Sequence, residues 1–471
     1  MTHKAKFFFV GLAGLLAGAA LTVNLSAIAN KGVETALPIE ELRAFTDVFA
    51  RIKSDYVEPV EDKKLITEAI NGMLVGLDPH SSYLDVEGFK DLQVGTQGEF
   101  GGLGIEVSME DGLVKVISPI EDTPAFKAGV KPGDLIVKLD ETPVKGMSLN
   151  DAVKRMRGKP GTKLKLTIAR KGVDKPVVLT LTRAVIKIRS VKSKLIENGY
   201  GYVRVTQFQE HTGELLADAL KDMYKENKAP LKGLILDLRN DPGGLLNGAV
   251  AVAAAFIKPD SLVVYTEGRT EDAKMRLTAS RENYLRPMQG DYLKSLPEGV
   301  KQVPMVVLVN SGSASASEIV AGALQDHKRA VIMGTRTFGK GSVQTILPIG
   351  NGTAIKLTTA HYFTPSGRSI QAKGIEPDIL VEDPAATSED EGMRIREADL
   401  DKHLTNPNGN ETATESKPDK TIKSPPATKP GKDDKDKKPL TLEPGEVVSK
   451  HDFQVNQALN LLKGLQILQA R

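Results

Sequence analysis

The spacing of apolar residues changes several times along the chain, and each change marks a different kind of segment. In the first segment apolar residues recur every three or four positions, which predicts amphipathic helices: Leu42, Phe45, Val48, Phe49 and Ile52, then Leu65, Ile66, Ile70, Met73 and Leu74. We therefore expect residues 30–95 to form an N-terminal helical segment used for packing or for a dimer contact. His80 follows Asp78-Pro79 at a turn, where a single histidine is typically a structural or surface residue.

From about residue 96, apolar and polar residues alternate as they do in half-buried strands. Residues 105–108 and 113–118 flank Asp111-Gly112, a pair typical of β-hairpin turns. Two further strands are predicted at 134–140 and 164–169, with a short helix starting at Ser148 between them. Residues 96–184 thus form a separate domain built mainly of strands.

Residues 185–383 alternate strand patterns with helix patterns. The predicted elements are, in chain order, strand 200–208, helix 214–223, strand 231–238, a helix after Asp241-Pro-Gly-Gly244, strand 305–309 and a helix from about Ser315. This order is typical of an α/β fold, in which ligands bind at the carboxyl ends of the strands. Two motifs fall at such ends, residues 241–244 and 311–318.

The two ends of the chain have a different character. Lys4 and Lys6 precede an apolar run and a small-residue Ala27-Ile28-Ala29 site, so residues 1–29 predict a signal peptide or membrane anchor that takes the rest of the chain to the periplasm. Residues 384–450 contain no aromatic residue and are rich in Pro, Lys, Asp, Glu, Ser and Thr, which indicates a disordered linker. Residues 451–471 predict one apolar-rich helix, which is marginal alone and is expected to dock on its own chain or on a second copy.

The amino-acid composition excludes several classes of functional site. The chain has 63 Lys and Arg against 60 Asp and Glu, a formal charge of +3, so charge gives no case for a nucleic-acid partner. It has no cysteine, which excludes disulfides, thiolate nucleophiles and cysteine-ligated metal sites. Any nucleophile must therefore be an oxygen or a nitrogen, and we expect no cofactor and no metal.

The segment Gly334-x-x-x-x-Gly339-Lys340 has the outline of a phosphate-binding loop. Such a loop needs Ser or Thr directly after its lysine and a helix beyond it, but Gly341 comes next and residues 342–349 have a strand pattern. A lysine among glycines, with no carboxylate close in sequence, can instead lose its solvent, have its pKa lowered and act as a general base to serine. An ordinary solvated loop lysine is the alternative.

Small residues fill the junction at 311–318, where the amides at the start of a helix can stabilise an alkoxide or an oxyanion. The junction contains four candidate nucleophiles, and its pattern does not choose among them: Ser311, Ser313, Ser315 and Ser317. Ser315 with Glu318 also fits a capping box, the commoner role of a serine at a helix start.

Glycines are concentrated at the start of the strand-rich domain. Gly101-Gly102-Leu103-Gly104-Ile105, together with Pro124-Ala-x-x-Ala-Gly-Val-Lys-Pro-Gly-Asp134, resembles a PDZ domain. The resemblance implies that Gly101, Gly102, Leu103, Gly104 and Ile105 receive the terminal carboxylate of a peptide on their backbone N–H groups, which glycines leave accessible. A glycine-rich turn between strands is the alternative interpretation.

Four further segments follow this PDZ-like domain in a characteristic order: Asp237–Gly244, Ser313–Ile319, Gly339–Gln344 and Tyr362–Ile370. Together they resemble the carboxy-terminal processing (tail-specific) proteases. The resemblance implies an α/β fold, with a mixed-sheet serine peptidase core, an inserted PDZ-like domain, an N-terminal helical segment and a C-terminal helix. Its motifs place the nucleophile on Ser315, the base on Lys340, the glutamine that orients the lysine on Gln344, and the oxyanion donors on the backbone N–H of Ala316 and of Gly243 or Gly244.

The resemblance also implies a periplasmic serine endopeptidase that recognises the C-terminal tails of unfolded or tail-exposed exported proteins. The apolar faces of the terminal helices predict further copies of the chain as partners, in a dimer or higher oligomer, and residues 1–29 predict attachment to the inner membrane. An accessory lipoprotein is a further candidate partner. A Ser-His-Asp hydrolase stays open as an alternative, with His327 or His361 as base and Asp237 or Asp241 as acid. So does a non-catalytic PDZ adaptor, whereas nucleotide binding has the least support.

Overall fold

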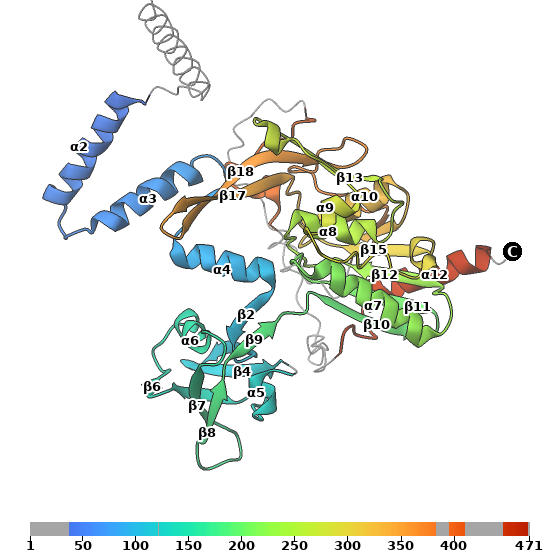
Figure 1. The fold of residues 1–471 in the computed structure, drawn as a ribbon, viewed down its shortest axis with the longest axis horizontal. Helices are drawn as coiled ribbons and strands as arrows, with labels where there is room; N and C mark the ends of the chain where they lie inside the picture. Colours follow the sequence, from blue (N-terminus) through green and yellow to red (C-terminus); the bar gives the residue numbers. More distant parts are fainter. Residues whose placement is uncertain (1–36, 121, 383–394, 410–445, 470–471) are drawn as a thin grey trace, which may run out of the picture. The chain divides into compact units, whose positions relative to one another are not determined.

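The computed structural model describes residues 37–120, 122–382, 395–409 and 446–469 (Figure 1). The chain divides into two units, residues 1–70 and residues 71–471. The expected signal or anchor at residues 1–29 lies outside the described residues. In the part of the chain that is described, no helix has the length and apolar character needed to cross a membrane.

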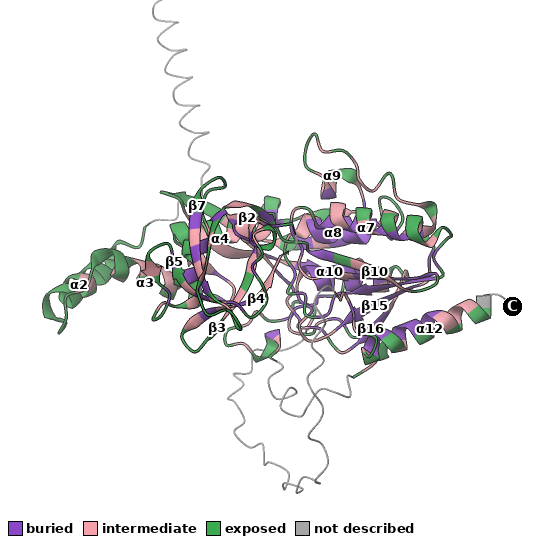
Figure 2. Ribbon diagram, turned by 90° about the horizontal axis from the view of Figure 1, so that it is seen from below, coloured by how far each residue is buried: buried purple, intermediate pink, exposed green. Residues whose placement is uncertain are grey.

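Two helices confirm the helical pattern near the N-terminus, α2 (Ile39–Asp55) and α3 (Asp62–Val75). Helix α2 buries none of its residues, and its apolar positions Leu42, Phe45 and Val48 are exposed (Figure 2). An apolar stripe of this kind is compatible with the dimer contact, which stays a prediction.

A six-stranded sheet forms the strand-rich domain. Its strands are β3 (Ile105–Glu110), β4 (Leu113–Pro119), β5 (Leu135–Leu139), β6 (Thr142–Pro143), β7 (Lys163–Ala169) and β8 (Val177–Thr182), all paired antiparallel. Alternate residues of β4 and β7 are buried, as their period of two predicts. Helices α5 (Pro124–Lys127) and α6 (Leu149–Met156) complete the domain, and β2 (Glu99–Gly102) pairs with β9 (Ala184–Lys187) where the chain enters and leaves it.

The peptidase-like core is built on a second six-stranded sheet. Its strand order is β10 (Val191–Glu197), β11 (Tyr200–Val205), β12 (Gly233–Asp237), β15 (Met305–Val309), β16 (Val331–Gly334) and β19 (Ile379–Leu380). Strands β11, β12, β15, β16 and β19 pair with one another in parallel, whereas β10 pairs antiparallel with β11, so the sheet is mixed. Every residue of β12 and β15 is buried, as expected for parallel strands covered on both faces.

Helices cover both faces of this sheet (Figure 2). Leu234 and Leu236 of β12 pack in a cluster with α7 (Thr212–Asn227), α8 (Leu246–Ala254) and α10 (Ala316–Asp326). Between them, Ile235 points to the opposite face, where it packs with α12 (Phe453–Gln469). The C-terminal helix therefore docks on its own chain, one of the two outcomes expected for it.

A smaller antiparallel sheet lies beside α8 and α10. It contains β1 (Ser82–Leu84), β18 (Thr353–Phe363), β13 (Leu262–Gly268) and β14 (Arg276–Thr278), with β17 (Ser342–Gly350) also paired to β18. Strand β1 comes from the segment that the sequence assigns to N-terminal helices. Its residues Ser82 to Leu84 pair with Lys356 to Ala354, so that segment contributes a strand to the core before α4 (Val86–Gln97) begins.

Part of the expected linker is packed rather than disordered. Residues 395–409 lie inside the range 384–450, yet Glu397 is completely buried and Asn406 is 6% exposed. The carboxylate of Glu397 accepts hydrogen bonds from Gln371 Nε2 (2.8 Å) and bonds His80 Nε2 (2.8 Å). Most of the remaining linker lies outside the described residues.

Candidate active site

Two loops meet at the carboxyl ends of the adjacent parallel strands β12 and β15. Asp237, the last residue of β12, pairs with Leu308 of β15, so the chain segments that follow them start side by side. The N–H of Ala314 donates to the carbonyl of Asp241 (3.0 Å). The prediction that residues 241–244 and 311–318 lie at the carboxyl ends of strands is confirmed, and the structure adds that the two loops meet.

Hydrogen bonding separates the serines of the junction. Ser313 is fully buried and its hydroxyl donates to Leu238 O (2.8 Å), while Ser317 is fully buried and its hydroxyl donates to Asp241 O (3.0 Å). Both hydroxyls hold the two loops together. Ser315 is half-buried, which leaves it as a more accessible nucleophile than either neighbour.

The backbone of Ser315 is strained. Its φ of 53° and ψ of −111° lie outside the regions that residues with a side chain normally occupy, at a cost of about 1–3 kcal/mol. The residue is the last of the loop that joins β15 to α10, directly before the first residue of the helix. The neighbouring Ala316 is the first helical residue, so its N–H has no acceptor within the helix.

Gly243 lies directly against this turn. A Cβ atom built on Gly243 would approach Ala316 N and Ser315 Cβ to 2.8 Å, and its φ is +97°. Only glycine fits, which brings one predicted oxyanion residue next to the predicted nucleophile. The N–H of Gly243, however, donates to Asp241 Oδ1 (2.9 Å), so it is already engaged in this structure.

Glu318 joins the serine turn to the lysine loop. It is completely buried, and its Oε2 accepts the backbone N–H of both Ser315 (2.8 Å) and Lys340 (2.9 Å). Its Oε1 accepts Gly339 N–H (2.7 Å) and the hydroxyl of Thr337 (2.5 Å). Burial raises the pKa of Glu318 to about 7, against the opposing effect of these hydrogen bonds. The capping interaction that the sequence suggests thus also fixes the loop of Lys340.

Tyr362 of β18 makes a second connection. Its buried hydroxyl donates to the carbonyl of Ser315 (3.2 Å) and contacts the carbonyl of Lys340. Burial raises the pKa of Tyr362 well above its ordinary value, so the phenol stays a donor. The backbones of Ser315 and Lys340 are therefore fastened to the same two side chains.

Lys340 has the electrostatics expected of a lysine that can lose its proton. Burial is the main cause that lowers its pKa, and the nearby charge of Lys356 adds to it. Three carboxylates act in the opposite direction, those of Glu397, Glu318 and Asp78. Within the described residues its Nζ forms no hydrogen bond, including none to Ser315, and catalytic hydrogen bonds often form only when substrate binds.

Gln344 lies on β17, two positions after Ser342 on the same side of the strand. Its Nε2 donates to Ser342 Oγ (3.0 Å) and to Thr358 Oγ1 (3.2 Å). Strand β17 also settles the phosphate-loop question, because a strand rather than a helix follows Lys340.

The histidines of the alternative triad lie in other surroundings. His327 is exposed and its Nε2 bonds Leu262 O (2.7 Å). His361 is partly buried, burial lowers its pKa, and its Nδ1 has no hydrogen-bond partner among the described residues. Asp237 is paired with Arg239 through Oδ2 (2.6 Å), so it does not orient a histidine.

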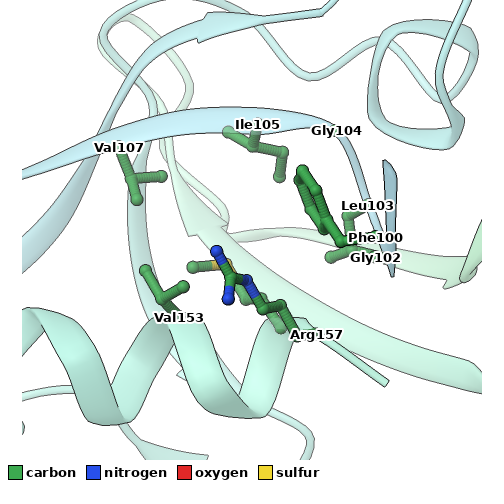
Figure 3. A pocket seen from close by; sticks show the side chains of 9 residues that line it. Phe100, Gly102, Leu103, Gly104, Ile105, Val107, Val153 and Arg157 are labelled. Atoms are coloured by element: carbon green, nitrogen blue, oxygen red, sulfur yellow. The ribbon is translucent and has the colours of Figure 1, made fainter. Parts of the chain in front are cut away.

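A small pocket lies at the predicted carboxylate loop of the PDZ domain (Figure 3). It has a volume of about 120 Å³ and is lined by Phe100, Gly102, Leu103, Gly104, Ile105, Val107, Val153, Met156 and Arg157. Gly101 does not line it, because this residue packs against Gly158, whose N–H donates to Gly101 O (3.0 Å). The sequence pattern missed Arg157, whose guanidinium lies 5.1 Å from the centre of the Phe100 ring and forms an ion pair with Asp91 Oδ1 (3.2 Å) beside the pocket.

The sequence of the chain that forms this site is similar to those of known peptidases. Residues 199–381 match peptidase family S41. A carboxy-terminal-processing protease of Bartonella bacilliformis is 49% identical over 82% of this chain and 84% of its own length. This chain belongs to peptidase family S41. It is a carboxy-terminal processing serine peptidase, and the predicted family and enzyme class are confirmed.

Two further family models match parts of this S41 peptidase. Residues 101–181 match the PDZ domain, and residues 6–88 match the N-terminal domain of the activating protease CtpB. The carboxy-terminal processing protease CtpA of Bacillus subtilis is 36% identical over 82% of this chain and 78% of its own. Among solved structures, a photosystem II D1 C-terminal processing protease has a TM-score of 0.41 and 30% identity, covering 76% of this chain and 92% of its own. The assignment rests on the sequence relatives.

Proposed function

We propose that the protein is a periplasmic endopeptidase in which Ser315 is the nucleophile and Lys340 the base. The observation that carries the proposal is the shared anchoring of the two residues. Glu318 accepts both backbone N–H groups on one oxygen atom, and the single hydroxyl of Tyr362 lies against both carbonyls and donates to that of Ser315. Anchoring on buried side chains limits the entropy that is lost when the two groups meet a substrate.

In this mechanism neutral Lys340 takes the proton of the Ser315 hydroxyl as the oxygen attacks a peptide carbonyl. The resulting C–O bond gives a tetrahedral oxyanion, which the N–H of Ala316 and one N–H of the 243–244 turn stabilise. Protonated Lys340 then gives its proton to the leaving amine, and water attacks the acyl-enzyme with the same base. The lowered pKa of Lys340 supports the first step because it increases the neutral fraction.

The oxyanion site needs one adjustment to act in this way. Gly243 N–H is held by Asp241 Oδ1, so either this hydrogen bond opens when substrate binds or Gly244 supplies the donor. Burial raises the pKa of Asp241 to about 7, against a hydrogen bond from Gly243, and its Oδ2 has no partner within the described part of the chain. A carboxyl that is partly protonated near neutrality holds an N–H more weakly than a carboxylate does.

The PDZ domain supplies substrate choice in this proposal. A PDZ domain suggests binding of protein C-terminal tails, and the apolar pocket beside Arg157 suits a tail that ends in an apolar residue. We further propose that residues 1–29 direct the protein to the periplasm, that it works as an oligomer, and that it acts on unfolded or tail-exposed proteins, with an accessory lipoprotein as a candidate partner. Separation of periplasmic from cytoplasmic fractions tests the location.

The test of the mechanism uses the purified protein and an unfolded substrate with a free apolar C-terminus. Ser315→Ala and Lys340→Ala are each expected to lower cleavage by at least about 10²-fold, the usual contribution of a positioned base. Ser311→Ala and Lys373→Ala serve as matched controls, because Ser311 belongs to the same junction and the exposed Lys373 to the loop next to Gly339, and both should cleave normally.

Two outcomes would count against parts of the proposal. Full cleavage by Lys340→Ala, or loss of cleavage in a His327→Ala His361→Ala variant that remains folded, would remove lysine as the base. Equal cleavage of substrates with a free and an amidated C-terminus would remove carboxylate recognition from the role of the PDZ domain.

A further inference from the structure

The turn at residues 78–81 is built into the core next to Gln344. Asp78 and Ser81 are each only 3% exposed, although both precede the PDZ domain by about 20 residues in a segment whose sequence shows no chemistry. Pairing of β1 with β18 holds this turn in place. A buried carboxylate that is remote in sequence from the predicted catalytic residues needs a physical explanation.

Both carboxylate oxygens of Asp78 accept hydrogen bonds from neighbouring groups. Its Oδ1 accepts the hydroxyl of Thr358 (3.0 Å) and the backbone N–H groups of His80 (2.8 Å) and Ser81 (2.9 Å). Its Oδ2 accepts the hydroxyl of Ser81 (2.6 Å), whose oxygen also accepts Thr358 N–H (3.1 Å). Burial alone would raise the pKa of Asp78, but these hydrogen bonds outweigh it and hold the pKa below its ordinary value.

The charge on Asp78 decides where the protons of its neighbours point. An ionised carboxylate only accepts, so Thr358 must give its single hydroxyl proton to Asp78. The hydroxyl of Thr358 therefore has only lone pairs to offer Gln344, and the amide group facing it must be the NH₂. The second N–H of that group goes to Ser342 Oγ (3.0 Å), which leaves Oε1 as the free end of the amide.

We infer that Asp78 and Thr358 are positioning residues that fix the orientation of the Gln344 amide, so that its oxygen is the end left free to accept from the amine of Lys340 when substrate binds. The inference rests on the proposed function. If the amide turned over, its N–H would donate into the lone pair that Lys340 needs for the proton of Ser315. An oxygen there accepts a proton of the amine and leaves the lone pair free.

Thr358→Val tests this chain of hydrogen bonds, because it removes the hydroxyl and keeps the shape and charge of the site. A hydrogen bond that depends on a charged group controls an equilibrium by about ten- to a hundredfold, so kcat should fall by that factor with KM little changed. Thr358→Ser should restore most of the activity. Thr359→Val is the matched control, since it removes a hydroxyl from the next residue of β18, which bonds Thr345 Oγ1 (2.6 Å) instead.

The pH profile separates positioning from simple damage to the fold. With the amide free to turn, the protonated form of Lys340 loses an acceptor, so the acid limb of kcat/KM should move to lower pH in Thr358→Val. This variant keeps the charges that shift the pKa of Lys340, which are those of Lys356, Glu397, Glu318 and Asp78. Asp78→Asn is a less specific test, because it also removes one of the charges that shift the pKa of Lys340.

A double-mutant cycle gives the decisive result. Gln344→Ala should lose as much activity as Thr358→Val, and combining the two should cost no more than either alone, because both act through one amide. Additive losses, or a Thr358→Val enzyme that matches Thr359→Val in kcat and pH profile, would overturn the inference. If Lys340→Ala is inactive in the same assay, only the inference fails; if it remains active, the proposed base fails as well.

Discussion

Replacing Gly243 with alanine tests how closely the 241–244 loop approaches the nucleophile. The new Cβ would lie 2.7 Å from Ala314 O and 2.8 Å from both Ala316 N and Ser315 Cβ, at a φ of +97°. The unfavourable φ costs about 1–3 kcal/mol and the crowding about another 1–3 kcal/mol, so the free energy of unfolding should fall by about 2–6 kcal/mol. Displacing the oxyanion donors should lower kcat by about 10²–10³.

Gly350→Ala is the control for the backbone term alone. Gly350 has a φ of +103° at the exposed end of β17, and a Cβ there would meet nothing within 4 Å. In urea unfolding, the unfavourable φ of alanine should lower the free energy of unfolding of both variants, and steric crowding should lower it further only in Gly243→Ala. Peptide cleavage should fall only in Gly243→Ala. If the two variants are equally stable and equally active, the loop does not contact Ser315 as described.

Two further predictions concern buried charges. Asp452, directly before α12, accepts hydrogen bonds from Arg239 on both carboxylate oxygens (3.1 and 2.8 Å). In urea unfolding, Asp452→Asn should therefore lower the free energy of unfolding by about 1–3 kcal/mol. The exposed pair of Lys463 with Glu197 is the control, and Lys463→Ala should lower the free energy of unfolding by less than about 1 kcal/mol. Lys340→Met should raise the melting temperature near neutral pH, because a lowered pKa means that the folded protein holds the lysine proton more weakly than the unfolded chain does. That cost to the wild type is complete below the folded pKa of Lys340 and fades as the pH rises toward 10.5, so a difference from wild type that grows with pH would contradict the burial argument.

The position of the two loops could be predicted because it follows from local pattern, whereas the assignment of individual site residues came from the family resemblance. Parallel strands end at one edge of a sheet, so the motifs after β12 and β15 had to meet, and a strand pattern after Lys340 was enough to exclude a phosphate loop. The local sequence does not decide which of the serines is the nucleophile. The choice depends on where the hydroxyls of Ser313 and Ser317 point, which only the packed loops decide.

The contributions of distant segments could not be predicted. Asp78 bonds Thr358 across 280 positions of sequence, and a carboxylate at a turn has no pattern that indicates burial. The burial of Glu397 could not be predicted for a different reason. Residues 384–450 are polar as a whole, and this overall composition masks the short segment around Glu397 that packs against the core. A single buried glutamate among many exposed charges leaves no periodic signal.

The most direct test of the central claim measures the rate at which a small phosphonofluoridate labels Ser315, as a function of pH, in the wild type and in Lys340→Ala. This reaction needs an activated hydroxyl but no PDZ domain and no peptide. The account predicts a wild-type rate that rises with pH and levels off below 10.5, the ordinary pKa of lysine, and a rate about 10²–10⁴ lower, without that titration, in the variant. Equal rates and equal pH profiles for the two proteins would show that Lys340 does not activate Ser315.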